Sequence, residues 1–86
     1  MTVEEYMEIA YNLAQMAADQ DETPVGAIIV DPKSGEIISQ AYNQSSHSGD
    51  ATSHAEILAI QRACENLKTS RLWGMDMYVT DRKSVV

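Results

Sequence analysis

The feature that most constrains the fold is a six-residue apolar run, Val25–Val30, interrupted only by Gly26. A continuous apolar run of this length, bounded by turn residues, is typical of a β-strand that is buried on both faces. Pro24 precedes the run, and Asp31-Pro32-Lys33-Ser34-Gly35 follows it as a strong turn signal. The chain must therefore supply further elements that cover both faces of this strand.

The residues around this run predict a helix before it and a second strand after it. Thr2 and Glu5 have the spacing of a capping box, so a helix is expected over residues 2–18. Its apolar residues recur at steps of three and four: Tyr6, Ile9, Ala10, Leu13, Met16 and Ala17. The apolar run itself is the strand 25–30, and residues 36–41 are expected to return beside it as an antiparallel strand.

The later part of the chain predicts a second helix over residues 53–67, with Ser53 as its N-cap, and a third strand over residues 75–80. One face of this helix is apolar and is expected to point toward the core; it consists of Ile57, Ile60, Cys64 and Leu67. Because a helix separates the last two strands, the third strand is expected to run parallel to the second through a right-handed crossover.

Composition limits the classes of protein to which the chain can belong. The 86 residues form one domain at most and carry a formal net charge of −7, and residues 1–22 contain no Lys or Arg. A stand-alone nucleic-acid-binding surface is disfavoured, because phosphates are neutralised by clustered Lys and Arg. The acidic start is unlike a secretory signal and no apolar run has membrane-spanning length, so a cytoplasmic location is expected. The single cysteine, Cys64, excludes an internal disulfide.

The residues best suited to a catalytic role are in the segment His54-Ala55-Glu56, at the start of the second predicted helix. Residues two apart on a helix point about 200° away from each other, but at a helix start both side chains tilt toward the N-terminal end. There His54 suits a zinc ligand, and Glu56 suits a carboxylate that takes a proton from zinc-bound water. The same three residues also fit a simple helix start that Ser53 and Glu56 cap.

In five segments the sequence resembles the cytidine and tRNA-adenosine deaminase family of zinc enzymes. The matching residues are Thr23-Pro24-Val25-Gly26-Ala27, Asn43, Asp50-Ala51-Thr52-Ser53-His54-Ala55-Glu56-Ile57, Arg71-Leu72 and Met77-Tyr78-Val79-Thr80. The resemblance implies the N-terminal α-β-β-α-β portion of a three-layer α/β/α sandwich with a mixed sheet, in one domain over residues 1–86. In order and spacing, the segments look most like the bacterial branch that converts adenosine to inosine at the tRNA wobble position.

The resemblance also implies roles for individual residues and partners. His54 would be a metal ligand for zinc, Glu56 the catalytic proton shuttle, and Asn43 a substrate-binding amide. Pro24 and Gly26 would shape the wall of the pocket near the base. The tRNA anticodon loop would be the substrate partner, and the full-length family implies a homodimer.

The chain departs from the family pattern after Thr80. There the family has P-C-x-x-C, whereas this chain has the tail 81–86, Asp81-Arg82-Lys83-Ser84-Val85-Val86, so two cysteine ligands of zinc are absent. Cys64 is ten residues beyond His54, which is about 15 Å along one helix and too far for a shared metal. His47 is expected to be an exposed loop residue.

Because two zinc ligands are absent, we expect this portion of a deaminase to be inactive alone. We also expect apolar surface to be exposed at the strand 75–80. Two alternatives stay open from the sequence. One is a portion of a guanine- or cytosine-type deaminase, which shares the same half of the metal site. The other, of a different class, is a non-catalytic acidic interaction module.

Overall fold

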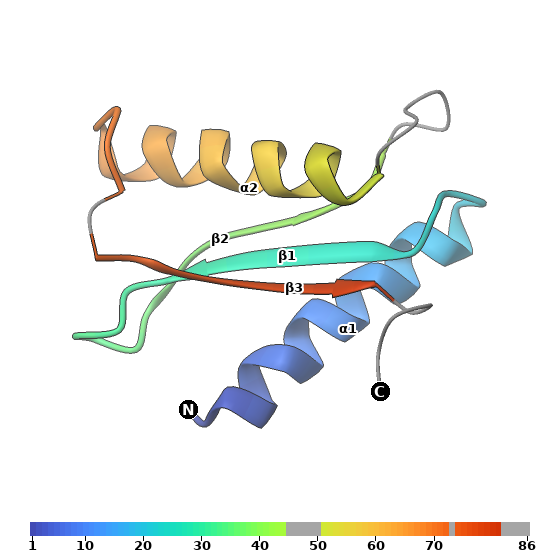
Figure 1. The fold of residues 1–86 in the computed structure, drawn as a ribbon, viewed down its shortest axis with the longest axis horizontal. Helices are drawn as coiled ribbons and strands as arrows, with labels where there is room; N and C mark the ends of the chain where they lie inside the picture. Colours follow the sequence, from blue (N-terminus) through green and yellow to red (C-terminus); the bar gives the residue numbers. More distant parts are fainter. Residues whose placement is uncertain (45–50, 73, 82–86) are drawn as a thin grey trace.

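A computed structural model of the chain describes residues 1–44, 51–72 and 74–81. Its elements occur in the predicted order of helix, strand, strand, helix and strand (Figure 1). They are α1 (Val3–Asp19), β1 (Val25–Val30), β2 (Ile37–Tyr42), α2 (Ala51–Leu67) and β3 (Asp76–Asp81). No helix in these described ranges is long and apolar enough to cross a membrane.

The three strands form one sheet that lies between the two helices. The strand order is β2-β1-β3, and β1 is antiparallel to both neighbours. Every residue of β1 is buried, as the apolar run predicted. Strands β2 and β3 run in the same direction with β1 between them, and α2 connects them across one face of the sheet while α1 covers the other (Figure 1).

Helix α1 begins at the predicted capping box. The Glu5 amide donates to Thr2 Oγ1 at 3.2 Å, and the Thr2 amide donates to a Glu5 carboxylate oxygen at 2.7 Å. These contacts with Thr2 hold the pKa of the Glu5 carboxyl below its usual value. The buried face consists of Tyr6, Ala10, Leu13, Ala14 and Ala17. Met16, which the periodicity placed on that face, is 46% exposed and lies outside it.

Helix α2 differs from the prediction in the face that it buries. Its fully buried positions are the alanines Ala55, Ala59 and Ala63. The residues expected in the core lie instead on an exposed flank: Ile57 is 54% exposed, Ile60 38% and Leu67 39%, and Cys64 is half-buried. The physical reason is that a row of alanines lets the helix approach the sheet closely, which a row of larger side chains would prevent.

Polar contacts fix this orientation of α2 on β2. The Ser39 hydroxyl donates to the Ala59 carbonyl at 2.8 Å within the buried interface. Arg62 Nη1 donates to the Gln40 carbonyl at 2.8 Å. Asn66 Nδ2 donates to the Ile38 carbonyl at 2.8 Å. The prediction of Ser53 as N-cap is also wrong, because α2 already begins at Ala51 and Ser53 lies within the helix.

The packing of α1 on β1 depends on Gly26. A Cβ at this position would lie 2.2 Å from the Ala10 carbonyl oxygen and 2.7 Å from the Ala14 amide nitrogen. The absence of a side chain at Gly26 thus serves the close approach of α1, and the expectation that Gly26 shapes the pocket wall near the base stays a prediction. The position faces α1, whereas His54 and Glu56 belong to α2 in the opposite layer.

Candidate functional site

One end of the sheet brings together the segments that the family resemblance singled out. The start of β1, the ends of β2 and β3 and the N-terminus of α2 all lie at this end (Figure 1). The strand register pairs Val25 with Asp81, and Gly26 with both Tyr42 and Thr80. A polypeptide that continues from β3 would therefore leave the sheet beside the start of α2.

His54 and Glu56 lie on either side of Ala55, whose side chain is fully buried against the sheet. Each helical residue turns the chain by about 100°, so these two side chains leave α2 on opposite sides of the buried face. Both are half-buried. Because helical side chains tilt toward the N-terminus, both lean toward the end of the sheet at which β3 finishes.

Asn43 directly follows β2 and lies at the same end of the sheet. Its side chain is completely buried, and its backbone amide donates to the Val25 carbonyl at 2.9 Å. Its Nδ2 donates to the Thr23 carbonyl at 3.3 Å. The side chain thus ties the end of β2 to the segment that leads into β1. Its predicted contact with a substrate stays a prediction.

The neighbouring side chain of Tyr42 also contacts the segment that follows α1. Gln20 Nε2 donates to the Tyr42 hydroxyl at 3.0 Å. Hydrogen bonds from the side chains of Gln20 and Gln44 lower the pKa of this phenol from its usual value. These bonds hold the end of β2 in place next to Asn43.

The described residues fit part of a zinc site but not a complete one. In the ranges that the structure covers, no three His, Cys, Asp or Glu side chains come close enough together to hold a metal ion. Cys64 is three helical turns from His54 and lines a different surface, and His47 lies outside the described residues. Chemically, His54 offers one imidazole ligand and Glu56 one carboxylate, and a tetrahedral site needs further ligands.

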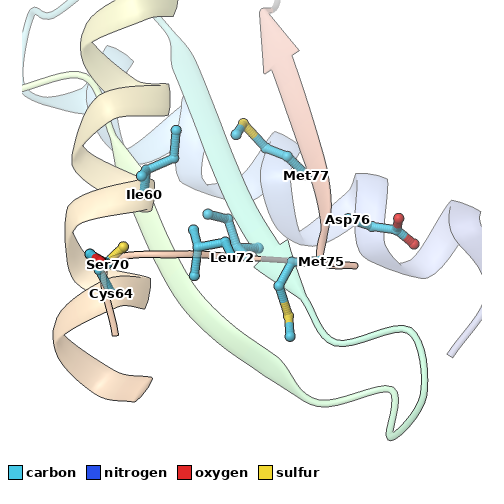
Figure 2. A pocket seen from close by; sticks show the side chains of 8 residues that line it. Ile60, Cys64, Ser70, Leu72, Met75, Asp76 and Met77 are labelled. Carbon is cyan, nitrogen blue, oxygen red and sulfur yellow. The ribbon is translucent and has the colours of Figure 1, made fainter. Parts of the chain in front are cut away.

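A groove that the sequence did not predict lies between α2 and β3. It has a volume of about 280 Å³, and its lining includes Ile29, Ile60, Cys64, Leu72, Met75 and Met77 (Figure 2). The signal for it in the sequence is the apolar spacing of α2, which by itself predicts a side that faces the core. The groove lies on the same face of the sheet as α2, beside the edge of β3.

Comparisons with known proteins agree with this arrangement. A family model described as the cytidine and deoxycytidylate deaminase zinc-binding region matches residues 1–82. The tRNA-specific adenosine deaminase of Aquifex aeolicus is 48% identical over 80 residues, which are 93% of this chain and 52% of that protein. The enzyme of the same name from Bacillus subtilis is 42% identical over 81 residues, or 93% of this chain and 49% of that protein.

Two solved structures share the fold. One comes from work on tRNA:A34 deaminases that edit the wobble position of transfer RNA. Its TM-score is 0.77 and its sequence identity 42%, and the match covers 90% of this chain and 54% of the chain in that structure. The other is guanine deaminase from Bacillus subtilis, with a TM-score of 0.76 and 34% identity, over 92% of this chain and 50% of that one. The chain spans about half the length of the relatives that it matches. It belongs to the cytidine and deoxycytidylate deaminase family, whose zinc-binding region it matches over residues 1–82.

Proposed function

We propose that this chain supplies the histidine–glutamate half of a zinc-dependent nucleobase deaminase, and that the substrate is adenosine at the wobble position of tRNA. The observation that carries the proposal is the position of His54 and Glu56 on the first turns of α2, at the end of the sheet where β3 finishes. His54 is the proposed metal ligand, and Glu56 is the proposed proton carrier. Asn43, at the same end, is the proposed contact for the base or ribose.

The proposal assigns an incomplete metal site to the 86 residues. They contain one cysteine, Cys64, and it lies about 15 Å along α2 from His54. A zinc site with two thiolates therefore has to receive both from another polypeptide segment. The chain alone is expected to show no deaminase activity and no stoichiometric zinc.

The tRNA substrate is favoured over a free base by the comparisons. The two solved structures have almost the same TM-score, so the fold does not separate the two substrates. Sequence identity does differ: 42% for the tRNA:A34 deaminase and 34% for the guanine deaminase. The relatives from Aquifex aeolicus and Bacillus subtilis are both named tRNA-specific adenosine deaminase. Such a substrate fits the predicted cytoplasmic location.

The acidic charge of this chain implies that the phosphate contacts lie elsewhere. The net charge is −7, and α1 has two acidic residues, Glu4 and Glu5, in its first turn and no basic residue in its last. Clustered Lys and Arg are needed to bind an anticodon stem-loop. We expect these groups, like the two thiolates, on the segment that completes the domain.

The activity is tested in a fusion of residues 1–80 to the Aquifex aeolicus segment that follows its matching strand. We expect this fusion to convert adenosine to inosine in an anticodon stem-loop RNA, and to leave guanine and cytidine unchanged. Ammonia release and inosine content are the two measurements. Deamination of guanine but not of the RNA would reject the tRNA substrate, and activity on none of the three would reject the proposed function.

The role of Glu56 is tested by Glu56→Gln in the same fusion. The amide cannot accept and return a proton, so kcat is expected to fall by at least about 100-fold. The matched control is Glu65→Gln, which changes an exposed carboxylate on the same helix. If both variants kept the parent kcat, Glu56 would not be the proton carrier.

A further inference from the structure

The connection between α1 and β1 is tied to the end of β2 at two points. Gln20 Nε2 donates to the Tyr42 hydroxyl at 3.0 Å, and Asn43 Nδ2 donates to the Thr23 carbonyl at 3.3 Å. Figure 1 shows this connection at the end of the sheet where α2 begins and β3 finishes. Glu22 lies between the two ties, one residue from the contact with Asn43.

The backbone of Glu22 is also held from the side of α1. Its amide donates to the Ala17 carbonyl at 2.9 Å, in the last turn of that helix. The preceding residue, Asp21, has a positive φ of 60°, a conformation that Asp adopts more readily than most residues do. Glu22 is therefore fixed in place before any ligand arrives, and a fixed group loses less conformational entropy on binding.

The carboxylate of Glu22 lacks hydrogen bonds that its position calls for. Its Oε1 is enclosed by protein and accepts no hydrogen bond from any residue that the structure describes. A charged oxygen that is withdrawn from water without a donor raises the free energy of the protein. The residue as a whole is only half-buried, so the carboxylate lies at the boundary with solvent. A ligand that donates to its other oxygen would stabilise this anion strongly.

The chemistry of a carboxylate limits what this ligand can be. A carboxylate accepts hydrogen bonds and donates none, so its ligand has to be a donor. In an adenosine within an RNA chain, the 3′- and 5′-oxygens are esterified, and the ring nitrogens outside the glycosidic bond are acceptors. The phosphates carry negative charge and are repelled. The 6-amino group and the 2′-hydroxyl are the donors that remain.

The layers of the fold favour the 2′-hydroxyl over the 6-amino group. The proposed reaction removes the 6-amino group, so that group has to face His54 and Glu56 on α2. Glu22 belongs to the connection that follows α1, the helix on the opposite face of the sheet (Figure 1). A nucleotide whose 6-amino group faces α2 therefore turns its sugar toward Glu22, with Asn43 between the two layers at the end of β2.

We infer that Glu22 is a specificity-determining residue that accepts a hydrogen bond from the 2′-hydroxyl of the target nucleotide. This contact would favour RNA over DNA, since the 2′-hydroxyl is the group that distinguishes them. It also accounts for a carboxylate close to a polyanionic substrate, where an uncompensated negative charge weakens binding. The inference rests on the proposed function in its choice of substrate.

The test uses the fusion of residues 1–80 to the Aquifex aeolicus segment. Two anticodon stem-loop RNAs are compared, which differ only in having adenosine or 2′-deoxyadenosine at the wobble position. We expect kcat/KM to be at least about tenfold higher for adenosine, as for one hydrogen bond to a charged group. Glu22→Met keeps the length of the side chain and removes the acceptor, so this ratio is expected to fall to within about twofold of one.

A conservative variant and a matched control accompany this substitution. Glu22→Gln keeps a neutral acceptor and is expected to give an intermediate ratio, and it covers the case in which circular dichroism shows Glu22→Met unfolded. The control is Glu36→Met, because Glu36 is an exposed carboxylate just before β2, at the opposite end of the sheet. A purely structural role of Glu22 would lower the activity on both RNAs alike. Equal losses on both RNAs, or an unchanged ratio in both Glu22 variants, would overturn the inference.

Binding of the same RNAs separates this inference from the proposed function. The Glu56→Gln form of the fusion is used, and dissociation constants are measured by fluorescence anisotropy. If Glu22→Met abolishes a preference for the adenosine RNA while the parent fusion deaminates no substrate, the sugar contact stands and the proposed function fails. If the parent fusion deaminates the RNA with a preference that Glu22→Met leaves unchanged, the proposed function stands and the inference fails. Equal binding of the two RNAs before any change at Glu22 would also overturn it.

Discussion

At the scale of single residues, the sequence and the family resemblance predicted chemical roles for three side chains but not the contacts that surround them. His54, Glu56 and Asn43 were selected by residue type and family resemblance, and the structure places all three at one end of the sheet. The sequence did not predict that Asn43 would be fully buried and bonded to the Thr23 carbonyl. Such contacts join residues 20 positions apart, and local periodicity contains no information about them.

Gly26 allows the sharpest residue-level prediction. Gly26→Ala is expected to destabilise the chain by about 3 kcal/mol, because the new methyl group would collide with the backbone of α1, which cannot move away as a side chain can. Urea unfolding followed by circular dichroism measures the change.

The control for this substitution is Gly74→Ala. An added Cβ at Gly74 meets nothing within 4 Å. The expected loss in the free energy of unfolding is therefore about 1 kcal/mol, which is the strain of an alanine at the positive φ of 73°. Equal losses in the two variants would mean that the approach of α1 to β1 is not close enough to exclude a methyl group.

At the scale of elements, the order of helices and strands was predictable and the orientation of α2 was not. The apolar run, the turn after it and the capping box at Thr2 each act locally, so the sequence contains their full signal. The orientation of α2 depends instead on the row Ala55, Ala59 and Ala63, whose small side chains have a weaker hydrophobic signal than the isoleucines nearby. Close packing and three hydrogen bonds to β2 outweighed the apolar flank.

The contribution of these bonds is tested at Ser39, which is 5% exposed. Ser39→Ala removes the donor to the Ala59 carbonyl and is expected to lower the free energy of unfolding by about 1 kcal/mol. The control is Gln40→Ala at the adjacent, exposed position, with an expected change within about 0.5 kcal/mol, because the bond from Arg62 goes to the backbone carbonyl of Gln40, which the substitution keeps. If Ser39→Ala left stability unchanged, the bond from Ser39 to the Ala59 carbonyl would not contribute to holding α2 in its orientation.

At the scale of the whole molecule, the two helices cover the sheet unevenly. Helix α1 closes one face of the sheet, and α2 closes the other over β1 and β2. The remaining surface joins the groove, the edge of β3 and the end of the sheet near His54. The sequence predicted exposed apolar surface at β3 from the break in the family pattern. It could not predict the groove, because that depends on which flank of α2 faces β3.

The central claim is that His54 is a ligand of the family's zinc site and that residues 1–86 do not complete this site by themselves. The direct measurement is the zinc content, by elemental mass spectrometry, of the 86-residue chain and of the fusion of residues 1–80 to the Aquifex aeolicus segment. The account predicts far less than one zinc per 86-residue chain and about one per fusion protein. It further predicts that His54→Ala removes the zinc from the fusion and that His47→Ala, at the other histidine of the sequence, does not. Zinc near one per 86-residue chain, or retained in the His54→Ala fusion, would contradict the claim.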